Sequence, residues 1–284
     1  MRLRVMNEQD ISGGLRLNTL SGWNQTAADW RRFLKNSPGG CFVMEHDGKV
    51  VGTATSIVYE SRFAWIGMVL VDHENRKQGI GTALLERAIE YLDESNVCIM
   101  KLDATPQGKP IYMKLGFVEE YEIERWILKR QPEGMPTIPR STCTRLDEMQ
   151  RERVLQADKE LFGADRSFLL RALSEEAPEF ATAVWEGELL QGYAFGRHGS
   201  FADHLGPWMA RTRAAAEKIL EGFLAQSFRE TVIVDCLKSN AMAVELLHSC
   251  GFAPSRPLTR MFRGQNLYPG KPDSFCAILG PEFG

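Results

Sequence analysis

The chain has 284 residues, of which 44% are hydrophobic and 25% charged, and its formal net charge at pH 7 is -3. That apolar fraction excludes a globally disordered chain, and the near-neutral charge gives no electrostatic basis for binding nucleic acid. No apolar run approaches the roughly 18 residues of a membrane helix, and no signal peptide is visible. We therefore expect a cytoplasmic protein of one large or two modest domains, with neither a membrane nor nucleic acid as a partner.

The six cysteines are spread along the chain and form no Cys-x-x-Cys pair. This spacing argues against a zinc site and against a disulfide framework. Several cysteines lie in apolar runs, as Cys98 does between Val97 and Ile99. We expect them to be small buried hydrophobic residues in a reducing compartment, and the scattered histidines give no metal site.

The first half alternates strand-like and helix-like segments. An Asp-Gly turn signal at Asp47 joins two strand-like runs, and apolar residues from Leu84 to Leu92 recur at helical spacing. A short helix is predicted to begin near Pro110 and to end at Gly116. The predicted strands are residues 41–45, 50–59, 64–72 and 97–102, with a further one after 117.

Residues 131–141 contain three prolines and a glycine, which favour neither a helix nor a central strand. They predict a linker over residues 131–140. After it the same order returns: a hairpin, a helical face at 216–224, a buried strand at 231–237 and a helix that ends at Gly251. Gly-Phe pairs at 116–117 and 251–252 close the matching units, so we predict a duplicated α/β domain, over residues 1–130 and 141–284.

The loop at residues 76–82 has the pattern Arg-x-x-Gly-x-Gly, with Arg76, Gly79 and Gly81. It opens a helix, whose N–H groups and positive dipole end attract phosphate, and glycine lets the backbone approach a ligand closely. A P-loop sequence is absent, and Leu84 stands where a dinucleotide fingerprint has its third glycine. Taken alone, the pattern also fits a glycine-rich turn without a ligand.

A second pattern, Tyr-x-x-Leu-Gly-Phe at residues 112–117, follows a buried strand. Together with residues 69–72 and the loop at 76–81, it resembles the GNAT superfamily of acyl-CoA N-acyltransferases, and the resemblance covers most of residues 1–129. It implies an α+β (mixed α/β) fold. In that fold a mostly antiparallel mixed sheet, flanked by helices, is splayed at its middle, and acetyl-CoA lies in the gap.

The resemblance also implies residue roles. Loop N–H groups would hold the pyrophosphate, the backbone of residues 69–71 would pair with the pantetheine arm, and an N–H group of Leu70 or Val69 would stabilise the developing oxyanion. Tyr112 would protonate the leaving thiolate, since a phenol with a pKa of about 10 is protonated at neutral pH. Its alternative role is a half-buried aromatic residue on a helix face. The implied acetyl-CoA-binding residues are Val69, Leu70, Val71, Arg76, Lys77, Gln78, Gly79, Ile80, Gly81 and Thr82.

The general base is open between Asp103, Glu60 and a water relay, while Asp72 is expected to be a turn residue. The acceptor pocket is open as well. Trp23 and Asn24 could form its wall for a small amine. Alternatively, this stretch simply caps a helix from Asn24 or Thr26, and Trp30 packs inward.

The second half resembles a degenerate GNAT domain. Its strand-to-helix junction at residues 203–210 has no Arg-x-x-Gly-x-Gly, and Pro207 lacks a backbone N–H where donors are needed. Leu247 stands where the first half has Tyr112. The order resembles tandem-GNAT acetyltransferases with an atypical C-terminal domain. A polar cluster at residues 163–166 is either a helix start or part of a cleft.

These observations predict an N-acetyltransferase that moves an acetyl group from acetyl-CoA directly to a primary amine of a small metabolite or amino-acid-like acceptor. No covalent intermediate is expected, because no Ser or Cys nucleophile lies in the motif with a partner base. The alternative is a CoA-responsive binding protein with little turnover. A homodimer, formed through the second half, stays open.

Overall fold

The computed structural model describes residues 1–131 and 146–284, and the chain forms two compact units. Unit 1 comprises Met1–Glu120, Arg260–Leu267 and Pro281–Gly284, and unit 2 comprises Tyr121–Thr259 and Tyr268–Gly280. The units therefore do not follow the predicted chain boundaries at residues 130 and 141, because two short late segments belong to unit 1. From residue 132 on, the predicted linker lies outside the described residues, as does Cys143. Cys41, Cys236 and Cys276 are buried as expected, whereas the expectation was wrong for Cys98, which is exposed.

Unit 1 has a mostly antiparallel sheet in the order β1-β2-β3-β4-β5, and the end of β11 lies next to β5. Only β4 and β5 pair in parallel. The predicted hairpin turn is confirmed, since Asp47 and Gly48 both have positive φ, at 49° and 73°. The elements are β1 (Arg2–Val5), η1 (Glu8–Asp10), α1 (Ile11–Leu20), α2 (Ala27–Asn36), β2 (Phe42–His46), β3 (Lys49–Tyr59), β4 (Phe63–Val71), η2 (His73–Asn75), α3 (Ile80–Glu94), β5 (Met100–Ala104), α4 (Lys109–Lys114) and the end of β11 (Ala253–Arg263), whose residues before Arg260 belong to unit 2.

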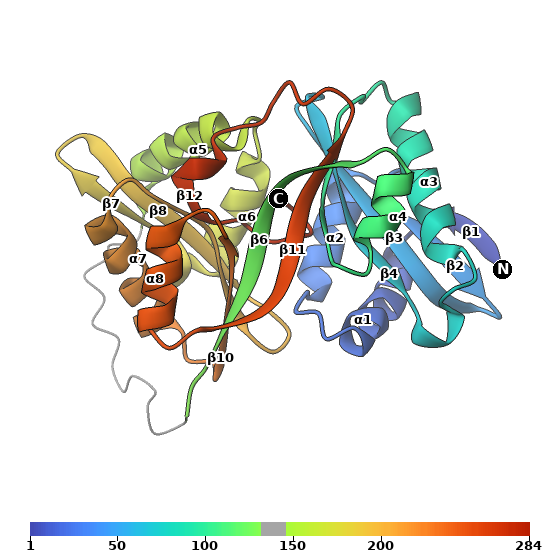
Figure 1. Ribbon diagram of the computed structural model, residues 1–284, viewed down its shortest axis with the longest axis horizontal. Helices are drawn as coiled ribbons and strands as arrows, with labels where there is room; N and C mark the ends of the chain where they lie inside the picture. Colours follow the sequence, from blue (N-terminus) through green and yellow to red (C-terminus); the bar gives the residue numbers. More distant parts are fainter. Residues whose placement is uncertain (132–145) are drawn as a thin grey trace. The chain divides into compact units, whose positions relative to one another are not determined.

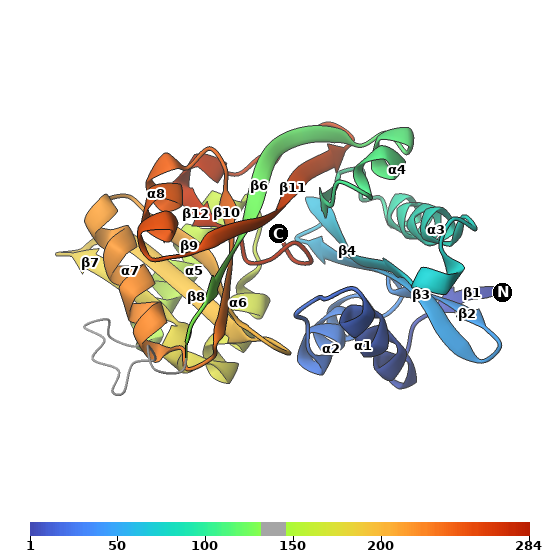
Figure 2. The ribbon, with the colours of Figure 1, turned by 60° about the horizontal axis from the view of Figure 1, so that its bottom comes forward.

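Helices cover both faces of the unit 1 sheet. Figure 2 shows α1 and α2 on one face and α3 and α4 on the other. The predicted apolar face of α3 is buried against β4 and β5, with Leu85 and Leu92 fully buried beside Ile66 and Leu102. The periodicity read from the sequence thus fixes which side of α3 meets the sheet.

Unit 2 repeats this arrangement. Its sheet has the order β6-β10-β12-β9-β8-β7, and β9 and β10 also pair in parallel at one end. The sequence-predicted hairpin at Gly187 is confirmed by its φ of 58° between β7 and β8. The elements, coloured along the chain in Figure 1, are β6 (Val118–Lys129), α5 (Glu148–Phe162), α6 (Ser167–Glu176), η4 (Pro178–Phe180), β7 (Thr182–Glu186), β8 (Leu189–His198), β9 (Asp203–Ala210), α7 (Arg213–Gln226), β10 (Thr231–Leu237), α8 (Ala241–Ser249), η5 (Pro272–Ser274) and β12 (Phe275–Ala277).

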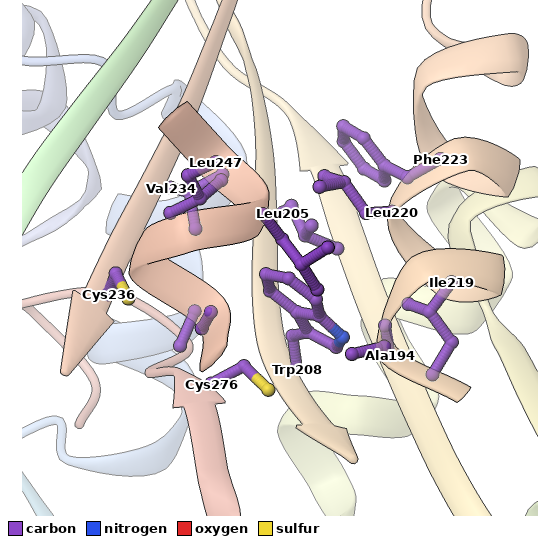
Figure 3. Close-up of a cluster of buried hydrophobic side chains, with 14 of the residues drawn as sticks. Ala194, Leu205, Trp208, Ile219, Leu220, Phe223, Val234, Cys236, Leu247 and Cys276 are labelled. Atoms are coloured by element: carbon purple, nitrogen blue, oxygen red, sulfur yellow. The ribbon is translucent and has the colours of Figure 1, made fainter. Parts of the chain in front are cut away.

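The core of unit 2 lies between this sheet and helices α7 and α8. Figure 3 shows Trp208 and Leu205 of β9 beside Ile219 of α7, Leu247 of α8 and Cys276 of β12. Each of these five side chains is at most 1% exposed. The short strand β12 is therefore an integral part of the unit 2 core.

The polar cluster at residues 163–166 is a helix junction in unit 2. Gly163 ends α5 with a φ of 95°, and Arg166 immediately precedes α6. The Arg166 guanidinium is 1% exposed and binds both carboxylate oxygens of Asp158, at 2.8 and 2.9 Å. The helix start that the sequence favoured is thus confirmed, with a buried ion pair behind it.

Candidate active site

The first backbone N–H groups of α3 have no side-chain cap. Gly79 is the N-cap residue with a φ of 78°, and no side chain caps the helix. The first N–H groups of a helix have no intrahelical acceptor, so those of residues 80–82 point out of the helix beside the positive end of its dipole. A negatively charged group fits here without displacing a side-chain cap.

The loop before α3 is attached to the end of β4. Arg76 Nε donates to the carbonyl oxygen of Val71 at 3.2 Å, and Lys77 and Gly79 are exposed. Asp72 is the N-cap of η2 and accepts from Arg16 at 2.6 Å, a hydrogen bond that lowers the pKa of Asp72. As the sequence indicated, Asp72 is a turn residue.

Strand β4 leaves its neighbour β5 soon after it begins. The parallel pairing of the two strands covers Ala64 with Met100 and Trp65 with Lys101. Within the described residues, no strand pairs with the later part of β4 on this side. Unit 1 thus has the splayed sheet that the resemblance implied, with an edge from Ile66 to Val71 that pairs with no other described strand.

A bulge in β4 lies at the point where the strands separate. The register with β3 shifts between Thr53 and Thr55, so that one β3 residue faces two residues of β4, Met68 and Val69. Met68 has a φ of 51°, in the left-handed region that non-glycine residues rarely adopt. Bulges of this kind redirect the backbone groups that follow them.

The bulge determines which backbone groups face the gap. The N–H group of Asp72 donates to Val51 on β3, at 2.8 Å. Because successive strand residues direct their N–H and C=O groups to opposite sides, Leu70 also faces β3, whereas Val69 and Val71 face the gap. The side chains of Val69 and Val71 are half-buried against the helix α3 side of the sheet.

Tyr112 lies on α4, and it packs against the same core cluster as Val69. Its ring makes an edge contact with Phe117, with centroids 6.2 Å apart, and covers Gly108, where a Cβ would lie 2.9 Å from the ring. Burial raises the pKa of Tyr112 to about 12. The phenol is therefore protonated throughout the neutral range, as a proton donor must be.

The two carboxylates proposed as bases have different surroundings. Both oxygens of Asp103 accept from Arg260 of β11, each at 2.8 Å, and its side chain is 0% exposed. A carboxylate held by a bidentate guanidinium is a weak proton acceptor. Glu60 lies in the β3–β4 turn with a φ of 50°, 3.5 Å from Arg62 and 29% exposed. Neither geometry favours proton abstraction at the gap.

The α1–α2 connection contains the candidate acceptor residues. Trp23 is half-buried and Asn24 is 1% exposed, on the face of unit 1 that α1 and α2 cover. Thr26 is the N-cap of α2, and its N–H donates to Asp29 at 2.8 Å. Trp30 is fully buried, so for this residue the capped-helix interpretation is confirmed.

In unit 2 the helix that corresponds to α3 is capped by its own chain. Only two residues separate β9 from α7, and the Thr212 hydroxyl accepts from the Ala215 N–H at 3.2 Å. The Arg211 N–H donates to Gln191 as that of Asp72 does to Val51, at 2.8 Å in each case. Helix α7 therefore begins with a side-chain cap and without a glycine loop, whereas α3 begins without a side-chain cap.

The gap in unit 2 is filled by a strand. Beyond the parallel pairing of β9 with β10, β12 lies between them, with Phe275 opposite Met209 and Ala277 opposite Trp208 and Cys236. Arg211 corresponds to Asp72, because the two residues make equivalent hydrogen bonds. Trp208 therefore corresponds to Val69, since each lies three residues earlier in its strand. The edge that is open in unit 1 is therefore paired within the chain in unit 2.

The same alignment of the two units places Pro207 and Leu247. Pro207 lies inside β9 in the place of Met68, and not in the helix cradle where the sequence suggested a missing donor. A proline cannot adopt the positive φ of Met68. Leu247 does match Tyr112, since Phe252 donates to Leu247 as Phe117 does to Tyr112, at 3.0 and 3.1 Å.

Sequence reasoning missed several residues around the bulge. Thr53 Oγ1 donates to the Met68 carbonyl at 2.7 Å, and Thr55 Oγ1 to the Gly67 carbonyl at 3.1 Å. Arg260 stacks on the Trp65 ring at 4.4 Å while it binds Asp103. Alternating threonines on β3 were visible in the sequence, whereas nothing local signalled a partner 157 positions from Asp103.

Two properties of the described residues bear on partners. In the two described ranges, no helix is both long enough and apolar enough to cross a membrane. Within the same ranges, no group of three or more His, Cys, Asp or Glu residues is arranged to hold a metal ion.

Comparisons with known proteins agree with this geometry. Residues 15–117 match the acetyltransferase (GNAT) family, and residues 154–275 match an acetyltransferase (GNAT) domain. The chain is 25% identical over 265 residues to a holothin acyltransferase from Pseudoalteromonas, covering 92% of this chain and 87% of the relative.

Solved structures share the fold. One from Pyrococcus horikoshii superposes with a TM-score of 0.80 at 24% identity, covering 100% of this chain and 95% of the other. A tandem GNAT protein from the clavulanic acid biosynthesis pathway gives a TM-score of 0.65 at 14% identity, covering 93% and 98%. With two matched GNAT regions, two splayed sheets and this tandem architecture, the chain belongs to the GNAT N-acyltransferase family and carries two GNAT domains.

Proposed function

We propose that unit 1 transfers an acetyl group from acetyl-CoA directly to the primary amine of a small acceptor, and that the chain has one such site. The observation that carries this proposal is the contrast at the gap. In unit 1 an uncapped helix N-terminus adjoins an unpaired strand edge, whereas in unit 2 Thr212 caps the helix and β12 occupies the edge.

The residues of unit 1 fit an acyl-CoA donor, which the family uses and which supplies the activated thioester. The N–H groups of residues 80–82 would hold its pyrophosphate, with Arg76 and Lys77 nearby. The outward backbone of Val69 and Val71 would pair with its amide-bearing arm as an added strand. The remaining loop residues, Gln78, Gly79, Gly81 and Thr82, shape the cradle.

Of the two oxyanion donors that the sequence left open, we favour Val69 over Leu70. Strand alternation directs the Leu70 N–H to β3 and the Val69 N–H to the gap. Tyr112 packs on the same side of the sheet and keeps its proton, so it would protonate the leaving thiolate. The amine would lose its proton to water, since Asp103 is held by Arg260.

For the acceptor we propose a small amine that contacts the α1–α2 connection, with Trp23 and Asn24 in its wall. Asn24 is 1% exposed, and its side chain is an amide with donor and acceptor atoms. The family acts on amine acceptors, and one relative is named for a single compound, holothin. We further expect a cytoplasmic location.

Calorimetric titration of acetyl-CoA into the whole protein tests this proposal. We expect one site per chain, lost in Gly81→Trp, because the new side chain would fill the cradle. Thr212→Trp, at the corresponding helix of unit 2, is the matched control and should keep the site. Two sites, or a site lost only in the control, would contradict the assignment.

Turnover is measured on the same samples with a panel of small amines and a lysine peptide. Binding of acetyl-CoA without acetylation of any amine would favour the alternative, a CoA-responsive binding protein. Faster acetylation of the lysine peptide than of every small amine would overturn the proposed acceptor class.

A further inference from the structure

The segment Pro281–Gly284 is packed into unit 1, on the sheet face that α1 and α2 cover. Trp65 Nε1 donates to the Pro281 carbonyl at 2.9 Å, and the Tyr59 hydroxyl donates to the Phe283 carbonyl at 2.8 Å. The Phe283 ring stacks on Phe33 of α2 with centroids 4.8 Å apart. Glu282 and Phe283 are 2% and 1% exposed, so the segment is part of the core of this face.

The backbone of this segment touches β4 at Gly67. A Cβ atom on Gly67 would lie 2.7 Å from the Glu282 carbonyl oxygen and 3.1 Å from its Cα. Real Cβ atoms do not approach backbone so closely, which means that only glycine admits the segment at this place. Gly67 is also the residue directly before the bulge.

The bulge needs support from its surroundings. The positive φ of Met68 is an unfavourable conformation that persists only where neighbouring contacts fix it. Thr53 and Thr55 fix the carbonyl groups of Met68 and Gly67 from the β3 side. Glu282 packs on Gly67 from the sheet face, so the bulge is held from two directions.

Resting on the proposed function of unit 1, we propose that Pro281–Gly284 is a positioning element for acyl transfer. Its backbone holds Gly67 and the β4 bulge in place, and this fixes the direction of the Val69 N–H toward the acyl carbonyl. The segment acts through Val69 and does not touch the reacting atoms. Its removal would therefore lower the catalytic rate without disturbing the phosphate cradle at the start of α3.

Gly67→Ala tests the proposal, because the added methyl group displaces the Glu282 backbone. We expect kcat to fall about 100-fold, as small misplacements of reacting groups do, with unchanged affinity for CoA. Gly14→Ala is the matched control: its Cβ would lie 2.7 Å from the Trp30 ring, on the same side of unit 1 but away from the bulge. It should lower thermal stability and leave kcat near the wild-type value.

Two unreactive ligands separate positioning from loss of structure. Acetyl-dethia-CoA, in which a methylene replaces the sulfur, keeps the carbonyl oxygen in the thioester's place, and S-ethyl-CoA has the same length without this oxygen. We expect the wild type to prefer the ketone ligand by about fivefold, the effect of one hydrogen bond, and Gly67→Ala to lose this preference while it still binds S-ethyl-CoA. Tyr59→Phe removes one hydrogen bond to the segment and should reduce the preference less than Gly67→Ala does. It replaces Gly67→Ala in this experiment if that variant does not fold.

The outcomes are distinguishable. Failure of the wild type to bind either ligand would overturn the proposed function itself. Binding and turnover in the wild type, with kcat and ligand preference unchanged in Gly67→Ala, would overturn the role of Pro281–Gly284. Equal losses of kcat in Gly67→Ala and Gly14→Ala would also overturn it, since both would then reflect general destabilisation.

Discussion

The two units differ in how they satisfy the backbone groups at a helix N-terminus and at the edge of a central strand. Each has a helix that follows a central strand, and each has a parallel strand pair that separates along its length. In unit 2 the helix N-terminus is satisfied by Thr212 and the open edge by β12. In unit 1, among the described residues, no side chain caps the helix and no strand pairs with that edge.

This contrast concerns backbone groups that have hydrogen-bonding partners within the chain in one unit and lack them in the other. Exposed N–H groups and an unpaired strand edge are normally satisfied within the protein or by water. In unit 2 a side-chain cap and a short strand satisfy the two groups that correspond to the open helix N-terminus and the open strand edge of unit 1.

The largest effect is expected from cutting the chain at the predicted linker. A fragment of residues 1–130 lacks Arg260 and Pro281–Gly284, so it leaves Asp103 buried without its guanidinium partner. Removing one partner of a buried ion pair costs about 3–5 kcal/mol, a large share of a typical stability of about 5–15 kcal/mol. We expect no cooperative thermal transition of the fragment by circular dichroism.

Co-expression with residues 131–284 is the control for this experiment. It returns the missing segments as a separate chain and should restore a cooperative transition. A fragment 1–130 that melts cooperatively alone would show that unit 1 does not depend on the later segments.

The next largest effect is expected from aspartate substitutions at the N-caps of α3 and α7. Gly79→Asp places a carboxylate at the N-cap of α3, where it repels phosphate and where the φ of 78° also strains the new residue. Like charges in contact cost several kcal/mol, so acetyl-CoA affinity should fall about 100-fold or more. Thr212→Asp makes the same change at α7, where aspartate is an equally good cap, and should leave the affinity measured by calorimetry unchanged.

Tyr112→Phe tests the proposed proton donor, whose place in unit 2 is taken by Leu247. We expect kcat to fall about 10- to 100-fold while acetyl-CoA affinity is kept. Tyr91→Phe, another half-buried tyrosine against the same core cluster, is the control and should retain kcat. Equal activity of both variants would remove Tyr112 from the chemistry.

The pH dependence follows from the burial of Tyr112, which raises its pKa to about 12. At pH values below about 11, deprotonation of Tyr112 should therefore not reduce kcat. An unfolded tyrosine ionises near pH 10, so the folded state binds the proton more tightly, and this part of the stability is present below pH 10 and is lost between about pH 10 and 12. Between about pH 10 and 12, the melting temperature of the wild type should therefore fall relative to that of Tyr112→Phe.

The smallest effect concerns the cap that distinguishes unit 2. Thr212→Ala removes the bond to Ala215 and should lower the free energy of unfolding of unit 2 by about 1 kcal/mol. Thr212→Ser keeps a hydroxyl and should cost little in a denaturant titration. If alanine and serine were equivalent, the cap would not stabilise α7.

Local patterns in the sequence predicted much of the fold. The Asp47 turn, the apolar face of α3 and the glycine loop at Gly79 each depend on neighbours within a few residues. The match between Leu247 and Tyr112 followed from simple counting, because each lies a fixed distance before a helix-ending glycine. These features need no knowledge of the remaining chain.

Long-range pairing could not be predicted in this way. The short strand β12 has only three residues and no pattern that separates it from a loop. Nothing near Asp103 announces Arg260, and nothing near Gly67 announces Glu282. The bulge itself depends on pairing register, which also decides between Leu70 and Val69 as the donor that faces the gap.

The packing of Pro281–Gly284 has a consequence for how the protein is made. Its bonds to Trp65 and Tyr59 join residues 216 and 224 positions apart. A growing chain adds about 5–20 residues each second, so the first residues of unit 1 wait for roughly 10–40 seconds before their last partners are synthesised. Contacts of such long sequence separation also form slowly. During that interval the α1–α2 face lacks the contacts of Pro281–Gly284, and a ribosome-bound chain that is halted before Arg260 should remain sensitive to protease in a region that is protected once Pro281–Gly284 has emerged from the ribosome.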